Sequence, residues 1–119
     1  MRLSGGRFAV WWAPPVVVLF VVWLGLGGTT WDPQVPISFG GDGLFYLAQS
    51  KSTLDHGWWW VNPSLGLPTE YHALVFAQNT NVDQAIVWLV GRFTREVGAA
   101  VNVTWLIMLA LGSVTTTWG

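Results

Sequence analysis

Two apolar runs without a charged residue, 8–26 and 97–119, bracket this chain and constrain its fold more than any other feature. The hydrocarbon core of a bilayer is about 30 Å thick, and an α-helix crosses it in about 20 residues at about 1.5 Å per residue. Charged residues make up only 9% of the chain, against about 25% in an average soluble domain. The composition therefore argues against an ordinary soluble domain. We predict an all-α membrane protein with transmembrane helices at 8–28 and 99–118.

The placement of charge sets the expected orientation of these helices. Arg2 and Arg7 precede the first run, and all six acidic residues lie between the two runs. The positive-inside rule then predicts a cytoplasmic tail at 1–7 and an extracytoplasmic loop at 29–98, in a multi-pass protein of the cell membrane. A cleaved signal peptide is the competing interpretation of the first run, and the basic start fits it. The run is longer than usual for a signal peptide and no A-x-A site follows, so a retained helix is favoured.

Prolines and tryptophans add detail to the first helix. Pro14 and Pro15 lie near the amino end of the run and are expected to begin or kink the helix, because a missing N–H matters least in the first turn. Trp11, Trp12 and Trp31 are expected near the two membrane interfaces, where indole rings are enriched.

The loop carries two segments with helical spacing of apolar residues, near 43–56 and 82–95, and both are predicted to be amphipathic helices. Asp42 is the expected N-cap of the first, and Gly57 stands where a C-terminal cap is wanted. The expected apolar positions are Leu44, Leu47, Ala48 and Leu54 with Phe45 beside them, and then Val82, Ile86, Leu89, Val90 and Phe93. The other positions of the first helix include the polar residues Gln49, Ser50, Ser52 and Thr53.

Charged residues add two expectations for these helices. Lys51 and Asp55 are four residues apart, so they can form a weak ion pair on one helix face. Arg92 and Arg95 are expected in the last turn of the second helix, where cations interact favourably with the helix dipole, before Gly98 ends the helix.

The second apolar run is polar for a helix surrounded by lipid. Its polar residues are Asn102, Thr104, Ser113, Thr115, Thr116 and Thr117, and such side chains usually face neighbouring helices. The sequence Asn102-Val103-Thr104 matches a glycosylation acceptor, but its place inside the helix discounts it. No basic cluster follows Trp118, although an inward second span calls for one. The chain is therefore predicted to be the amino-terminal part of a longer multi-span protein; the alternative is a complete two-span protein.

Asp42 is the acidic residue with the strongest claim to chemistry. It follows two glycines, which let backbone and ligand approach closely. A carboxylate at the head of a helix near the membrane can act as a general base or bind a divalent cation. On the residues alone, a plain helix cap is the favoured interpretation of Asp42, and a turn residue is the favoured interpretation of Asp32.

The other candidate residues are weaker. His56 and His72, with Asp55 and Glu70 beside them in sequence, lack the close ligand spacing of zinc sites, so hydrogen bonding in the loop is favoured. The tryptophans at 58–60 can stack on a sugar or lie in the lipid interface, and the interface is favoured. A net charge of −1 and no basic patch argue against nucleic acid as a partner. The absence of cysteine excludes disulfides and thiolate metal sites.

Several short sequence elements within 40–105 are informative when they are taken together. They are Gly41-Asp42, Phe45-Tyr46, Lys51-Ser52, His56-Gly57-Trp58, Asn62-Pro63, Leu65-Gly66 and Pro68. Together they resemble the first extracytoplasmic loop of bacterial multi-span proteins related to GT-C glycosyltransferases. Members of that family have a short amino tail, one span, a long first loop with amphipathic helices, and then many more spans.

The resemblance implies a sugar donor carried on a polyprenyl phosphate, and an acid of the first loop that serves as base or metal ligand. That role falls on Asp42, which would hold a divalent metal ion, Mg²⁺ or Mn²⁺, as cofactor. Substrate contacts are expected from Trp58, Asn62, Glu70 and His72. The sequence departs from the family pattern at Glu70-Tyr71-His72, where the loop of relatives continues towards an Asp.

The resemblance also limits what this chain can do by itself. A lipid-donor groove needs the remaining transmembrane helices, which a parent chain or a partner would supply. We therefore expect the chain to be the inactive amino-terminal portion of a glycosyltransferase-like protein. The alternative is a small non-enzymatic two-span membrane protein that acts as a scaffold or assembly partner in the lipid bilayer.

Overall fold

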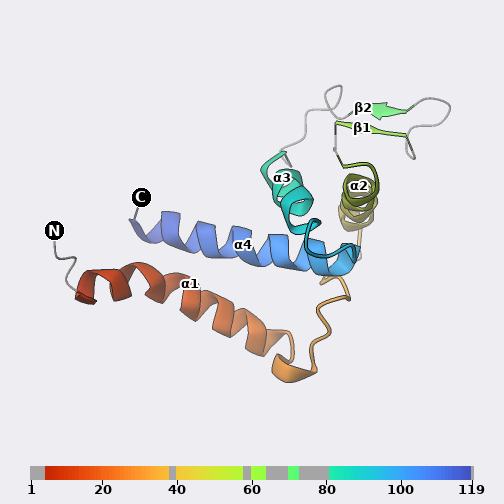
Figure 1. Ribbon diagram of the computed structural model, residues 1–119. Helices are drawn as coiled ribbons and strands as arrows, with labels where there is room; N and C mark the ends of the chain where they lie inside the picture. Colours follow the sequence, from red (N-terminus) through yellow and green to blue (C-terminus); the bar gives the residue numbers. More distant parts are fainter. Residues whose placement is uncertain (1–4, 38–39, 58–59, 64–69, 73–80, 119) are drawn as a thin grey trace. The chain divides into compact units, whose positions relative to one another are not determined.

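The computed structural model describes residues 5–37, 40–57, 60–63, 70–72 and 81–118, with side chains from Val10 onward (Figure 1). These residues are mostly helical, as predicted. A short antiparallel ladder of two strands departs from the all-α prediction. The helices are α1 (Gly5–Gly25), the 3-10 turn η1 (Gly28–Thr30), α2 (Asp42–His56), α3 (Asn81–Val90) and α4 (Val97–Trp118). Strands β1 (Val61–Asn62) and β2 (Tyr71–His72) pair with Val61 opposite His72. The chain divides into two compact units, 1–32 with 105–119, and 33–104.

Among the described residues, α4 is the one helix that is long and apolar enough to cross a membrane. The described apolar stretch of α1, Val10–Gly25, is shorter, so the predicted span at 8–28 stays a prediction. Pro14 and Pro15 lie inside α1, which begins at Gly5. The expectation that they begin the helix is therefore wrong.

In the unit of 1–32 and 105–119, large side chains bring α1 and the end of α4 together. The rings of Trp11 and Trp118 stack with their centroids 4.5 Å apart. An apolar groove of about 750 Å³ runs between the two helices, with Val17 on one side and Met108 on the other. Several bulky apolar side chains of this unit are exposed, namely Val16, Val17, Phe20, Val21 and Leu24. Such a surface suits lipid better than water.

In the unit of 33–104, one buried amide ties the segment 33–37 to the start of α4. Asn102, which is 1% exposed, donates from Nδ2 to the carbonyl oxygens of Pro33 and Val35, each at 2.8 Å. Its Oδ1 accepts from the N–H of Ile37 at 3.1 Å. Both polar atoms of this side chain are directed to the backbone of one segment, so Asn102 fixes where the chain enters the unit. The glycosylation acceptor sequence lies within helix α4, where Asn102 and Thr104 are buried.

The boundary between α3 and α4 differs from the prediction. Helix α3 ends at Val90, so Arg92 and Arg95 follow it instead of lying in its last turn. Gly98, expected to end that helix, lies in the first turn of α4. A Cβ at Gly98 would overlap the backbone carbonyl of Gln34, so a glycine is needed for the close approach.

The ends of α2 follow glycine chemistry. Gly41, with φ 53° and ψ −125°, is the N-cap, and Asp42 is the first helical residue; the expectation that Asp42 itself caps the helix is therefore wrong. A positive φ favours glycine at this position. At the other end, Gly57 has φ 87° and its N–H donates to the carbonyl oxygen of Thr53 at 2.9 Å. This confirms the predicted C-terminal cap.

The two loop helices are inverted in part relative to the prediction, because several of their uncharged polar side chains are buried and several apolar ones are exposed. The buried residues are Gln49, Ser50, Ser52 and Thr53 of α2, and Gln84 and Val87 of α3. The exposed ones are Leu44, Phe45 and Ala48 of α2, Val82 and Leu89 of α3, and Phe93 in the turn after it. Both helices form where the apolar spacing predicts them, although α3 ends at Val90. The predicted inner faces are wrong in part because α2 and α3 meet partly through hydrogen-bonding groups.

Candidate functional site

Gln84 is the centre of the polar contact between α2 and α3. It is 0% exposed; its Nε2 donates to Ser50 Oγ at 3.3 Å, and its Oε1 accepts from Thr53 Oγ1 at 3.1 Å. The Thr53 hydroxyl also lies 3.0 Å from the carbonyl oxygen of Gln49. It has a single proton, so it donates to one of these oxygens at a time. Within the described part of the chain, the buried Gln49 Oε1 has no hydrogen-bond partner.

Close packing surrounds this network. A Cβ at Gly91 would overlap the side chain of Leu54, so the end of α3 lies directly against α2. The ring of Phe45 meets the ring of Tyr71 edge-on, with centroids 5.7 Å apart and an interplanar angle of 80°. Helix α2 is thereby joined to both α3 and the ladder of β1 and β2.

A titratable pair borders the network. Burial, with a smaller contribution from the Asp83 carboxylate, raises the pKa of Tyr46 to about 12, although a hydrogen bond with Ser50 lowers it. Burial also raises the pKa of Asp83 above its ordinary value. Both shifts have the same origin, since a group with few water contacts is less stable in its charged form.

Asp42, the predicted base or metal ligand, lies exposed at the start of α2. Its side chain forms no hydrogen bond or ion pair with any other described residue. Its carboxylate is therefore not used for capping, which was the favoured interpretation of this residue from the sequence.

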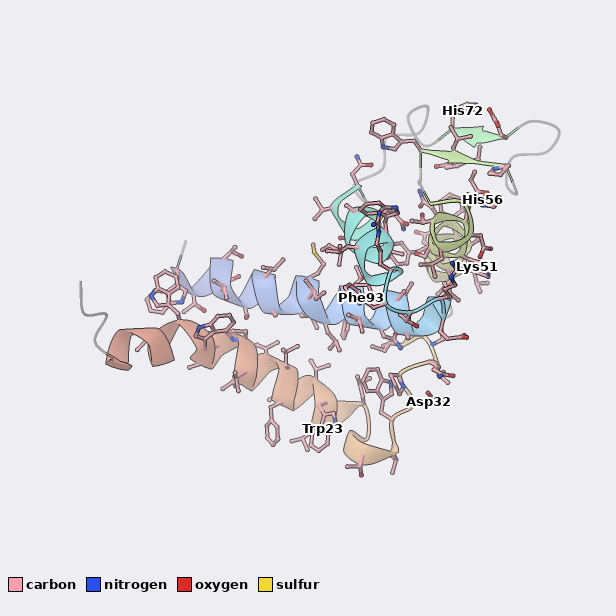
Figure 2. All side chains as sticks on the ribbon, viewed as in Figure 1. Trp23, Asp32, Lys51, His56, His72 and Phe93 are labelled. Carbon is pink, nitrogen blue, oxygen red and sulfur yellow. The ribbon has the colours of Figure 1, made fainter. Side chains whose placement is uncertain are left out.

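The predicted substrate-binding residues have different surroundings. Glu70 Oε1 lies 3.1 Å from His72 Nε2, and each side chain is about half exposed. Asn62 is buried on β1, opposite Tyr71. Trp58 lies outside the described residues. In the described part of the chain, no hydrogen bond or ion pair joins Asp42 to Glu70 or His72. The structure therefore brings together one pair of the set, Glu70 and His72, and His72 belongs to β2 (Figure 2).

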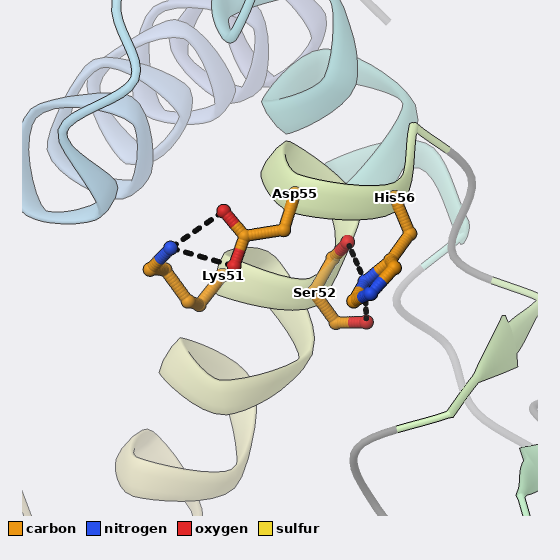
Figure 3. A network of polar contacts seen from close by, with 4 residues as sticks. All are labelled: Lys51, Ser52, Asp55 and His56. Atoms are coloured by element: carbon orange, nitrogen blue, oxygen red, sulfur yellow. Dashed lines mark hydrogen bonds and ion pairs between the residues drawn. The ribbon is translucent and has the colours of Figure 1, made fainter.

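The end of α2 carries a second local arrangement (Figure 3). Lys51 Nζ donates to both carboxylate oxygens of Asp55, at 2.5 and 2.6 Å, which confirms the predicted pair. His56 Nδ1 lies 3.3 Å from Ser52 Oγ and 3.2 Å from the Ser52 carbonyl oxygen. These contacts are all within one turn of one helix, as for hydrogen-bonding residues near a helix end. Among the described residues, no group of three His, Cys, Asp or Glu side chains could hold a metal ion.

Comparison with known proteins adds no family assignment. No protein-family model, no curated protein and no solved structure matches the chain. The chemistry must therefore be argued from the residues and their geometry.

The residues that organise the loop helices are not among the apolar positions predicted for these helices. Gln49, Ser50 and Thr53 recur at helical spacing, as the leucines do, and so define a face of their own. Polar side chains in membrane proteins usually face neighbouring helices. The rule holds for α2 only if α2 lies beside lipid, so the spacing alone does not tell which of its faces is buried.

The raised pKa of Tyr46 predicts a loss of stability in alkali. A tyrosine in an unfolded chain has a pKa near 10, whereas the pKa of Tyr46 in the folded chain is about 12. The folded state binds the proton more tightly, so this contribution is fully present below about pH 10 and is lost between about pH 10 and 12. In a Tyr46→Phe variant, the tyrosinate absorbance titration should lose its component near pH 12, and the alkaline fall in melting temperature should become smaller.

Tyr71→Phe is the matched control, because the chain has two tyrosines. It should keep the component near pH 12. An absorbance rise near pH 12 that is unchanged in Tyr46→Phe would contradict the assignment.

Proposed function

We propose that this chain is a membrane-anchored assembly module. In this proposal α1 and α4 are two transmembrane helices, and α2 with α3 forms an extracytoplasmic unit that presents apolar side chains to lipid or to further helices. The observation that carries the proposal is the inverted helix pair, with Gln84 buried and Leu44 61% exposed.

The energetics of that inversion favour apolar surroundings. Full burial of a Leu, Val or Phe side chain stabilises a protein by about 1.5–3 kcal/mol relative to exposure in water. Leu44, Val82, Leu89 and Phe93 all remain more than half exposed, so in water the unit would forgo several such contributions. Beside lipid or apolar helices this cost disappears, and hydrogen-bonding groups gain by facing one another. Further helices of a parent chain or of a partner are the expected neighbours.

The two-span anchor is supported by the first unit. The stack of Trp11 on Trp118 joins the amino-terminal part of α1 to the carboxyl-terminal end of α4. A pair of spans joined by a loop has this antiparallel arrangement. The Arg2 and Arg7 bias favours a cytoplasmic location for both chain ends.

Because the chain has no cysteine, single-cysteine variants can test this topology. We expect His72→Cys to react with a membrane-impermeant maleimide on intact cells. Thr117→Cys should react only after the membrane is permeabilised. Both positions are exposed, so local burial does not explain a difference between them. Labelling of both variants on intact cells, or of neither, would contradict two spans with cytoplasmic ends.

A second candidate function is a contribution to a glycosyltransferase-like site for a polyprenyl-phosphate sugar. The specific observation in its favour is Asp42, whose exposed carboxylate is used neither as a cap nor in an ion pair with a described residue. The carboxylate could serve as a base or as a ligand for Mg²⁺ or Mn²⁺. The donor groove would be completed by helices beyond this unit, so the chain alone is not expected to catalyse transfer.

Substitution of Asp42 separates chemistry from structure. Since Gly41 is the cap, Asp42→Asn and Asp42→Ala should both change the free energy of unfolding by less than about 1 kcal/mol, the size of a helix-dipole contribution. If the carboxylate acts as base or ligand, both variants should lose sugar transfer from a lipid-linked donor by about 100-fold or more in the parent-length protein. Asp55→Asn is the control for loss of an acid on the same helix. Transfer near the wild-type rate in Asp42→Asn would remove Asp42 from the chemistry.

A further inference from the structure

A pocket of about 490 Å³ lies within the unit of 33–104, where the carboxyl ends of α2 and α3 meet the residues before α4. Its wall includes Gly57, Trp88, Arg92, Thr94 and Arg95. Neither the anchor nor the Asp42 chemistry uses this pocket. It places the side chains of Arg92 and Arg95 at one opening, in a chain that has only five Lys and Arg residues.

The two arginines are available to a ligand. Both side chains are exposed, and the ion pairs between described residues are Lys51–Asp55 and Glu70–His72, so neither arginine is paired with an acid there. The guanidinium carbon of Arg92 lies 4.1 Å from the ring centroid of Trp88. This stacking restricts the side chain while leaving its N–H groups free to donate. A planar guanidinium fits a phosphate with two parallel hydrogen bonds.

The chain around the pocket points to a membrane-bound ligand. Phe93 lies between the two arginines in sequence and is 87% exposed (Figure 2). Residues 91–96 lead directly into α4 at Val97, the helix long enough to cross a membrane. At the end of a span, arginine head groups reach the lipid phosphates while aromatic rings lie among the glycerol and upper acyl groups.

We propose that this pocket binds the phosphate of an anionic phospholipid at the membrane interface. Arg92 and Arg95 would donate hydrogen bonds to the phosphate oxygens, and Phe93 would contact the apolar part of the same lipid. The inference rests on α4 lying in a membrane, but not on catalysis by Asp42 or on the apolar exterior of α2 and α3.

The test is a ³¹P NMR titration of the full chain in detergent micelles. The probes are dihexanoyl phosphatidylglycerol, dihexanoyl phosphatidylcholine and inorganic phosphate, whose signals are resolved from one another. We expect saturable binding of phosphatidylglycerol, with phosphatidylcholine and inorganic phosphate at least about tenfold weaker. Arg92→Gln and Arg95→Gln should each weaken phosphatidylglycerol binding by about tenfold, as expected for a lost charged hydrogen bond.

Lys51→Gln is the matched control, since it removes one positive charge outside the pocket. It should leave phosphatidylglycerol binding within about twofold of the wild type, because an exposed charge is screened by salt. Melting temperatures of all variants check that the unit remains folded. An equal loss in Lys51→Gln would mean non-specific attraction, and equal binding of inorganic phosphate would mean that no lipid is recognised; either result would overturn the proposal. Cysteine labelling tests the membrane spans separately, so failure of the pocket and failure of the anchor are distinguishable.

Discussion

The unit of 33–104 depends on two hydrogen bonds of Gln84, one donated to Ser50 and one accepted from Thr53. A buried amide that loses a partner costs about 1–3 kcal/mol, so α2 and α3 must meet with Gln84 opposite those hydroxyls. This requirement fixes which face of α2 lies inside. It therefore also decides that Leu44 lies outside, exposed to whatever surrounds the unit.

The same principle recurs at the start of α4. Asn102 forms hydrogen bonds with three backbone groups of one segment, and Gln84 forms hydrogen bonds with two hydroxyls. In both places a side-chain amide supplies directional contacts, and few large apolar side chains are buried among the described residues. The exposed apolar side chains of the unit gain when lipid or other helices cover them. This links the packing of the loop helices to the proposed assembly role.

Local features could be predicted from the sequence, and features set by the surroundings could not. The Gly57 cap and the Lys51–Asp55 pair depend on residues within one or two turns, and both were found. The length of α4 follows from its uncharged composition. The inner face of α2 could not be inferred from the spacing of Leu44 and its neighbours, because the same stripe faces inward in water and outward in lipid. In the candidate site, the contact of Glu70 with His72 is local, because the two residues are two apart in sequence. No local rule predicts where Asp42 lies relative to them.

A double-mutant cycle between Gln84→Leu and Thr53→Val tests the central claim most directly. The free energy of unfolding is measured for the wild type, both single variants and the double variant in the same detergent. A buried hydrogen-bonded pair should show a coupling energy of at least about 1 kcal/mol, whereas Gln84→Leu combined with Ser113→Ala of α4 should be additive. Coupling near zero, with both single variants as stable as the wild type, would contradict a polar interior between α2 and α3.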